Sequence, residues 1–130
     1  MKKILVVLSV MALTIPAAGG VDSTALIVGD FSNGNDAVVL KGKGKTLKSI
    51  KGLNVNLVEL SVSHYLLARG LDSVGLSERD IKVVNTSDAD IVAAFSSKDV
   101  QAAVFWNPQL SEALKMPDTV KVFYYSNIHV

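Results

Sequence analysis

Hydrophobic and polar positions alternate along the chain in blocks that predict strands and helices in turn. The runs rich in apolar and β-branched residues, typical of buried strands, are 55–60, 81–84, 100–106 and 120–125. Helical spacing or capping signals fall between them, at 62–74, between Ser87 and Lys98, and at 109–115. This alternation predicts an α/β fold with a mainly parallel sheet and helices on both faces.

The chain before residue 54 has a different pattern. Apolar runs at 24–28 and 37–40 flank the polar segment Asp30–Asp36, whose Asn-Gly pair is a strong turn signal. These runs predict a strand pair or a crossover. A loop of alternating glycine and lysine follows, and then a short helical turn near 47–50.

Three polar segments follow predicted strands. They are Glu59–His64, Asn85–Asp90 and Trp106–Pro108. Ligands of open α/β sheets bind beyond the carboxyl ends of the strands, near helix N-termini. We therefore expect these segments to converge on one crevice.

The corner that contains Ser61, Ser63 and His64 predicts a small-ligand site at the start of a helix. Backbone N–H groups and the positive end of the helix dipole point outward there, and the side chains add hydroxyl and imidazole groups. Helix capping alone is the alternative. A Gly-x-Ser-x-Gly motif is absent and no triad carboxylate can be assigned, so the corner favours binding and the protein is not expected to be an enzyme.

Four further side chains belong to the predicted site. Trp106 can stack on a planar ligand and Asn107 can donate and accept hydrogen bonds, although a core indole is an equal interpretation for Trp106. Asp88, like Asp90, has two interpretations. Its carboxylate either contacts the ligand or interacts favourably with the positive end of the dipole of its own helix. Glu59, at the end of an apolar strand, needs a partner if it is buried.

Composition narrows the classes of function. The 130 residues suffice for one compact domain, and 13 basic against 12 acidic residues give no basis for nucleic-acid binding. The clustered lysines between 41 and 51 favour a solvated loop over a phosphate site. Cysteine is absent and the two histidines are 65 positions apart, so we expect neither a metal nor another cofactor.

The N-terminus has the form of a secretory signal. Two lysines precede the apolar run Ile4–Ile15, which is shorter than the roughly 20 residues of a membrane span. Pro16 lies where a cleavable site would have alanine or serine.

Three ordered motifs, at 55–71, 83–95 and 103–108, resemble periplasmic substrate-binding proteins of the nitrate, sulfonate and taurine class of ABC importers. The subgroup encoded beside urea carboxylase is the most similar, and the resemblance covers about residues 12–125. Because it includes Ala12–Val21, that segment also looks like internal family sequence. We expect a periplasmic location, and a cytoplasmic one is the alternative if the N-terminus results from truncation.

The resemblance implies one lobe of a type II periplasmic-binding-protein-like fold. Residues 1–20 would be signal-like or residual first-lobe sequence, 21–53 crossover strands and a loop, and 54–130 the second ligand-binding lobe with a return strand. It also implies ligand contacts from Ser61, Ser63, His64, Trp106 and Asn107. The implied partners are a small nitrogen-containing solute of the urea or guanidinium type and, for a full-length protein, a membrane permease. Alternatives are a sulfonate, taurine or nitrate binder, or a truncated product without transport activity.

Overall fold

The computed structural model describes residues 34–124, and all structural statements below concern this part of the chain. Its elements are β1 (Asp36–Lys41), η1 (Leu47–Ile50), β2 (Asn54–Leu57), α2 (Val62–Ser73), η2 (Glu78–Asp80), β3 (Lys82–Asn85), α3 (Ile91–Ser96), β4 (Ala102–Trp106), α4 (Gln109–Ala113) and β5 (Thr119–Tyr124). The predicted alternation of strands and helices from residue 54 onward is confirmed. The predicted strand at 24–28 and the signal-like segment lie outside the described residues.

The five strands form one sheet in the order β3-β2-β4-β1-β5. β2 pairs in parallel with both β3 and β4, while β1 pairs antiparallel with β4 and with β5. Four strands therefore run in one direction and only β1 runs in the other. The predicted mainly parallel sheet is confirmed, and β1 is its antiparallel member.

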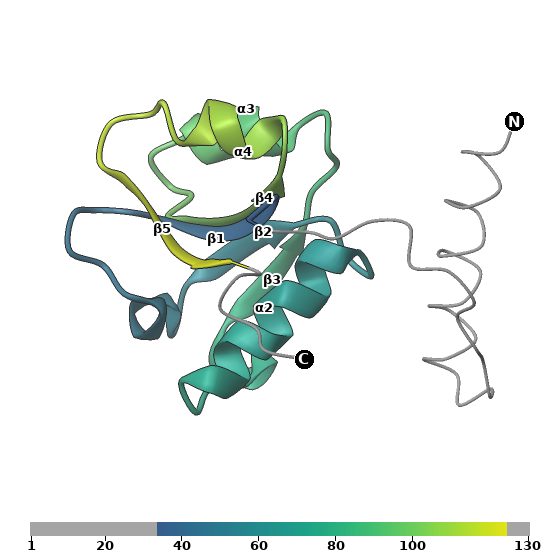
Figure 1. Ribbon diagram of the computed structural model, residues 1–130, viewed down its shortest axis with the longest axis vertical. Coiled ribbons are helices and arrows are strands. Elements are labelled where there is room, and N and C mark those ends of the chain that lie inside the picture. The colour runs from purple at the N-terminus through teal and green to yellow at the C-terminus, as the bar shows by residue number, and fades with distance from the viewer. Residues whose placement is uncertain (1–33, 125–130) are drawn as a thin grey trace, which may run out of the picture. The chain divides into compact units, whose positions relative to one another are not determined.

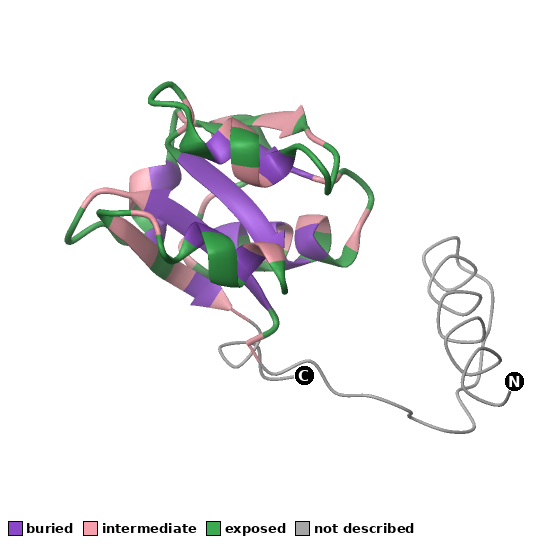
Figure 2. Ribbon diagram, turned by 90° about the horizontal axis from the view of Figure 1, so that it is seen from above, coloured by how far each residue is buried: buried purple, intermediate pink, exposed green. Residues whose placement is uncertain are grey.

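Helices cover both faces of this sheet (Figure 1), as predicted. Alternate residues of β1 point to opposite faces, so Val38 and Leu40 join the core beneath α2, whereas Ala37 and Val39 join the core with Phe95 of α3. Buried residues accordingly fill the central strands in Figure 2. The sheet thus has two apolar cores, and β1 contributes to both.

α2 is the longest described helix, and its sequence accounts for its limits. Ser61 is its N-cap, and the apolar side chains Leu66, Leu67 and Leu71 are buried on its sheet-facing side. Beyond its C-terminus Gly75 adopts a φ of +73°, a left-handed conformation that favours glycine. The predicted stop at Gly75 is confirmed.

Three predicted boundaries were wrong in detail. β2 ends at Leu57 rather than at Leu60, because Leu60 has a φ of 58° and belongs to a turn. The helix expected to be capped by Ser87 begins only at Ile91, since the Ser87 carbonyl accepts the N–H groups of Asp90 and Ile91 in a preceding turn. α4 ends at Ala113, two residues before the predicted end.

Gly70 of α2 lies against Phe123 of β5, and we expect Gly70→Ala to destabilise the fold. A methyl group at this position would come within 3.0 Å of the Phe123 ring. Overpacking outweighs the better helix propensity of alanine and leaves a net loss of about 1 kcal/mol. Chemical denaturation measures this loss, and Gly70→Ala should cost less in a Phe123→Leu background than in the unchanged chain. An equal or higher stability of the single variant would contradict the packing argument.

Candidate functional site

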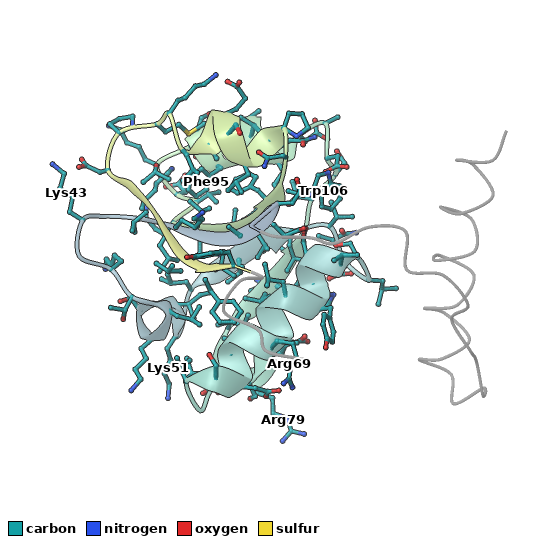
Figure 3. All side chains as sticks on the ribbon, viewed as in Figure 1. Lys43, Lys51, Arg69, Arg79, Phe95 and Trp106 are labelled. Atoms are coloured by element: carbon teal, nitrogen blue, oxygen red, sulfur yellow. The ribbon has the colours of Figure 1, made fainter. Side chains whose placement is uncertain are left out.

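The carboxyl ends of β2, β3 and β4 lie at one edge of the sheet, because these strands are parallel neighbours. Figure 3 shows Trp106 at the end of β4 on this edge. Since β1 runs in the opposite direction, its first residue, Asp36, lies here as well, in register with Trp106. The three predicted segments therefore share an edge with a fourth, the start of β1.

Polar contacts join the ends of β2 and β3. The Glu59 N–H donates to Asn85 Oδ1 at 3.1 Å. Asn56 Nδ2 donates to Thr86 Oγ1 at 2.9 Å, and the Thr86 N–H donates to the Leu57 carbonyl at 2.8 Å. These bonds hold the turn after β2 against the segment after β3.

Ser61 has a capping role. Its hydroxyl donates to the Val58 carbonyl at 2.6 Å and accepts the His64 N–H at 3.4 Å. The hydroxyl thus supplements the Ser61 carbonyl, which accepts the same N–H at 3.1 Å, as an N-cap side chain does. Ser61 is partly exposed, so its oxygen lies close to solvent at the site edge.

Ser63 is fully buried, and its hydroxyl donates to Oδ1 of Asp36 at 3.1 Å. The Asp36 side chain is buried too, with 4% of the residue exposed. This bond connects the second residue of α2 to the first residue of β1. Ser63 therefore faces the protein interior, and sequence reasoning missed its partner Asp36.

His64 makes contacts through both ring nitrogens. Nδ1 accepts the Leu60 N–H at 3.0 Å, and Nε2 lies 3.0 Å from Oε1 of Glu78. This pattern fits the tautomer with its proton on Nε2, which donates to the carboxylate. The imidazole thereby stabilises the turn through Leu60 that leads into α2.

The acidic residues of the predicted site are exposed on the turns after β2 and β3. Glu59 lies on the turn after β2 rather than at the strand end and is exposed, so its carboxylate does not need a protein partner. Asp90 accepts the Ser87 hydroxyl at 2.6 Å. Partial desolvation raises the pKa of Asp88 above its ordinary value. The carboxylates give this part of the edge an acidic character.

The segment after β4 combines an indole with amide groups. Trp106 is partly exposed and Asn107 is exposed. Asn107 Oδ1 accepts the Ser111 hydroxyl at 2.7 Å, and the following bond to Pro108 is cis. Gln109 comes next, and its Oε1 is the one buried side-chain atom of the described region that lacks a hydrogen-bond partner. Such an acceptor suits a water molecule or a ligand N–H group.

Apolar groups surround the polar corner. Leu60 is 96% exposed, and Val62 and Tyr65 on the first turns of α2 are more than half exposed. Together with Trp106 they give the edge the mixture of apolar surface and few polar groups that is typical of small-molecule sites.

The structure brings the predicted residues together in two groups. Ser61, Ser63 and His64 surround the start of α2, and Trp106 with Asn107 ends β4; Asp36 joins these groups through Ser63 and its register with Trp106. Asp36 and Gln109 are additions to the predicted set. A polar residue directly before a buried strand was the only sequence signal for Asp36.

The lysine-rich loop lies at the opposite edge, where β1 ends. Lys41 Nζ lies 4.8 Å from the centre of the Phe95 ring. Burial lowers the pKa of Lys41, and the negative charge of Asp99 opposes this effect. Lys43 forms an exposed ion pair with Asp118 at 3.5 Å. These contacts agree with a solvated loop.

Among residues 34–124, no three His, Cys, Asp or Glu side chains are grouped so as to hold a metal ion. None of the helices described for residues 34–124 has the length and hydropathy needed to cross a membrane.

Solved structures share this arrangement. The periplasmic aliphatic sulphonate binding protein SsuA of Escherichia coli matches 73% of this chain with a TM-score of 0.67 and 29% identity, over 33% of its own length. The alkanesulfonate-binding protein SsuA of Xanthomonas axonopodis pv. citri, bound to MOPS, matches 69% of the chain with a TM-score of 0.64 and 27% identity, over 32% of its length.

Sequence relatives agree with the structures. A binding protein of Brucella abortus is 30% identical over 97 residues, which is 75% of this chain and 30% of the relative. An Escherichia coli K12 protein named for binding aliphatic sulfonates is 40% identical over 70 residues, 54% of this chain and 22% of its own length. The chain thus spans about a third or less of the length of these relatives. All four are binding proteins by name, in agreement with the expectation that the chain is not an enzyme.

The fold, with the candidate site at the carboxyl ends of its parallel strands, corresponds to one part of a periplasmic-binding-protein-like α/β lobe. The family model described as "NMT1/THI5 like" matches residues 28–130, so the chain belongs to the NMT1/THI5-like family. This places it in the nitrate, sulfonate and taurine binding-protein class. The finer resemblance to the urea carboxylase subgroup has no counterpart among these matches.

Replacement of the N-cap should weaken the start of α2. We expect Ser61→Ala to lower the free energy of unfolding by about 1 kcal/mol, because the His64 N–H loses its side-chain acceptor and the Val58 carbonyl loses the Ser61 hydroxyl. Ser61→Asp keeps an acceptor and should retain most of the stability. Urea denaturation measures both variants. If Ser61→Ala were as stable as the unchanged chain, the hydroxyl would not act as a cap.

Stability should depend on the charge of Asp88. A raised pKa means that the folded state holds this proton more readily than the unfolded chain, so ionisation costs stability above the raised pKa. Asp88→Asn should therefore raise the thermal midpoint at pH 7 by about 1–2 °C. The difference should vanish below the ordinary value of 3.8. Asp118→Asn, at the opposite edge, is the control, and a lower midpoint for Asp88→Asn at pH 7 would contradict the sign.

Proposed function

We propose that this chain forms part of the solute-binding component of an ABC importer, which delivers a small polar solute to a membrane permease. The observation that carries the proposal is the common edge of β2, β3 and β4, where Ser61, Asp88 and Trp106 lie on neighbouring segments of the fold found in sulfonate-binding proteins. Such proteins act outside the cytoplasmic membrane, so a periplasmic location belongs to the proposal.

For the solute itself we propose a small planar nitrogen compound of the urea or guanidinium type. Its N–H groups would donate to carboxylates, and Glu59, Asp88 and Asp90 are exposed along this edge. Trp106 is partly exposed and has a planar face on which such a compound could stack.

A sulfonate, taurine or nitrate ligand is the second candidate. It is favoured by the names of the relatives, above all the Escherichia coli K12 protein at 40% identity over 70 residues. An anion would use the N-terminus of α2 and the hydroxyl of Ser61. The carboxylates of the same edge oppose this choice, because like charges repel.

The chain spans about a third of the length of its relatives. A site formed by one face of a cleft buries less of a ligand than a closed cleft, so we expect weak binding by this chain on its own.

Calorimetric titration of the chain with guanidinium, urea, taurine, ethanesulfonate and nitrate tests the proposal. We expect a millimolar response to guanidinium or urea, consistent with about −4 kcal/mol of binding free energy. Asp88→Asn should weaken it severalfold, whereas the matched Asp118→Asn at the opposite edge should leave it unchanged.

The alternatives predict different results. Binding of taurine, ethanesulfonate or nitrate without a response to guanidinium or urea would replace the proposed ligand but keep the binding function. If none of the five solutes binds the chain, and none binds after fusion to the remaining two thirds of a relative, solute binding by this edge is refuted.

A further inference from the structure

A buried carboxylate lies beneath the first turn of α2. Asp36 Oδ1 accepts the hydroxyl of Ser63, the second residue of this 12-residue helix, at 3.1 Å. Asp36 is 4% exposed and Ser63 is not exposed at all. The acidic group therefore lies inside the protein, within the helix turn where the dipole attracts negative charge most strongly.

The same carboxylate lies beside the end of β4. Asp36 and Trp106 are directly opposite each other in the antiparallel pair of β1 and β4, so their side chains lie on one face of the sheet. This is the α2 face, because Val38 of β1 and Val104 of β4 belong to the core beneath α2. Asp36 is thus placed between the start of α2 and the indole of the candidate site.

We propose that Asp36 is a specificity-determining residue that excludes anions from the corner between α2 and Trp106. The Asp36 carboxylate already contacts the first turn of this helix through Ser63, and its negative charge opposes a second anion there. This inference rests on the proposed function, which makes the corner a solute site, but its charge effect can be measured without any solute.

The physical basis is the low dielectric around a buried charge. A carboxylate held in the protein interior is screened less by salt than one on the surface, so its field reaches the neighbouring edge. Glu59, Asp88 and Asp90 on the turns after β2 and β3 add the same sign of charge, whereas His64 is paired with Glu78. An anionic solute would have to overcome this field, and a cation would gain from it.

Trp106 is the only tryptophan of the chain, so its fluorescence reports the local charge. Three quenchers of indole emission differ in charge: iodide is an anion, caesium is a cation and acrylamide is neutral. All three are compared at constant ionic strength. We expect Asp36→Asn to raise the ratio of iodide to caesium quenching about twofold, with acrylamide quenching unchanged. Asparagine has nearly the same shape as aspartate, and its side-chain oxygen can still accept the hydroxyl of Ser63.

Ser63→Ala is the matched control, because it removes the same hydrogen bond and leaves the carboxylate. We expect its quenching ratio to equal that of the unchanged chain. An unaltered ratio in Asp36→Asn, or an equal change in Ser63→Ala, would overturn the proposal in favour of a purely structural role. If Asp36→Asn does not fold, the chain with Glu59→Gln, Asp88→Asn and Asp90→Asn, which keeps Asp36, decides: relative to free N-acetyl-tryptophanamide, stronger quenching by caesium than by iodide supports the proposal, and the reverse overturns it.

Solute titrations then connect the charge to selectivity. Asp36→Asn should shift the ratio of taurine to guanidinium affinity at least about threefold towards taurine, while Ser63→Ala should weaken both alike. A shift in quenching without binding of either solute would refute the proposed function and leave the anion exclusion by Asp36 established.

Discussion

The antiparallel pairing of β1 with β4 is the constraint on which the other features of this fold depend. β1 is buried on both faces and supplies side chains to both apolar cores. Its pairing also links β5 to the parallel strands and fixes Asp36 opposite Trp106. A slip of one residue would exchange the two faces of β1 and turn Asp36 away from α2, so core packing and site geometry depend on the same register.

The start of α2 illustrates how structural and ligand roles share one segment. Ser61 caps the helix, Ser63 anchors it to β1, and His64 holds the turn at Leu60. Most of the polar atoms that looked available in the sequence thus have partners within the protein. What the corner offers a solute is mainly its charge and its exposed apolar rim, rather than a set of unpaired hydroxyl groups.

Local patterns in the sequence were enough to predict the elements, the mainly parallel sheet and the edge on which the strand ends meet. The direction of β1 was not predictable, because the pairing of residues 36–41 with 102–106 joins segments far apart in sequence and leaves no periodic signal. Asp36 was missed for that reason. The turn at Leu60 was missed because an apolar residue with positive φ is uncommon, and its acceptor, His64 Nδ1, is a tertiary feature. The ligand roles of Glu59, Ser61, Ser63, His64, Asp88, Trp106 and Asn107 stay predictions.

The residues of the two cores and the residues of the candidate site are largely different in this part of the chain. The two cores consist of buried apolar groups on the strands and on the inner sides of the helices, whereas Glu59, Asp88 and Asn107 are exposed on turns. Changes on those turns should therefore cost the fold little stability. Asp36 is the exception, because its carboxylate is buried, hydrogen-bonded and close to the candidate site. If the proposed function holds, the turns are the simplest places to change the solute without a loss of stability, whereas a change at Asp36 would affect the fold and the site together.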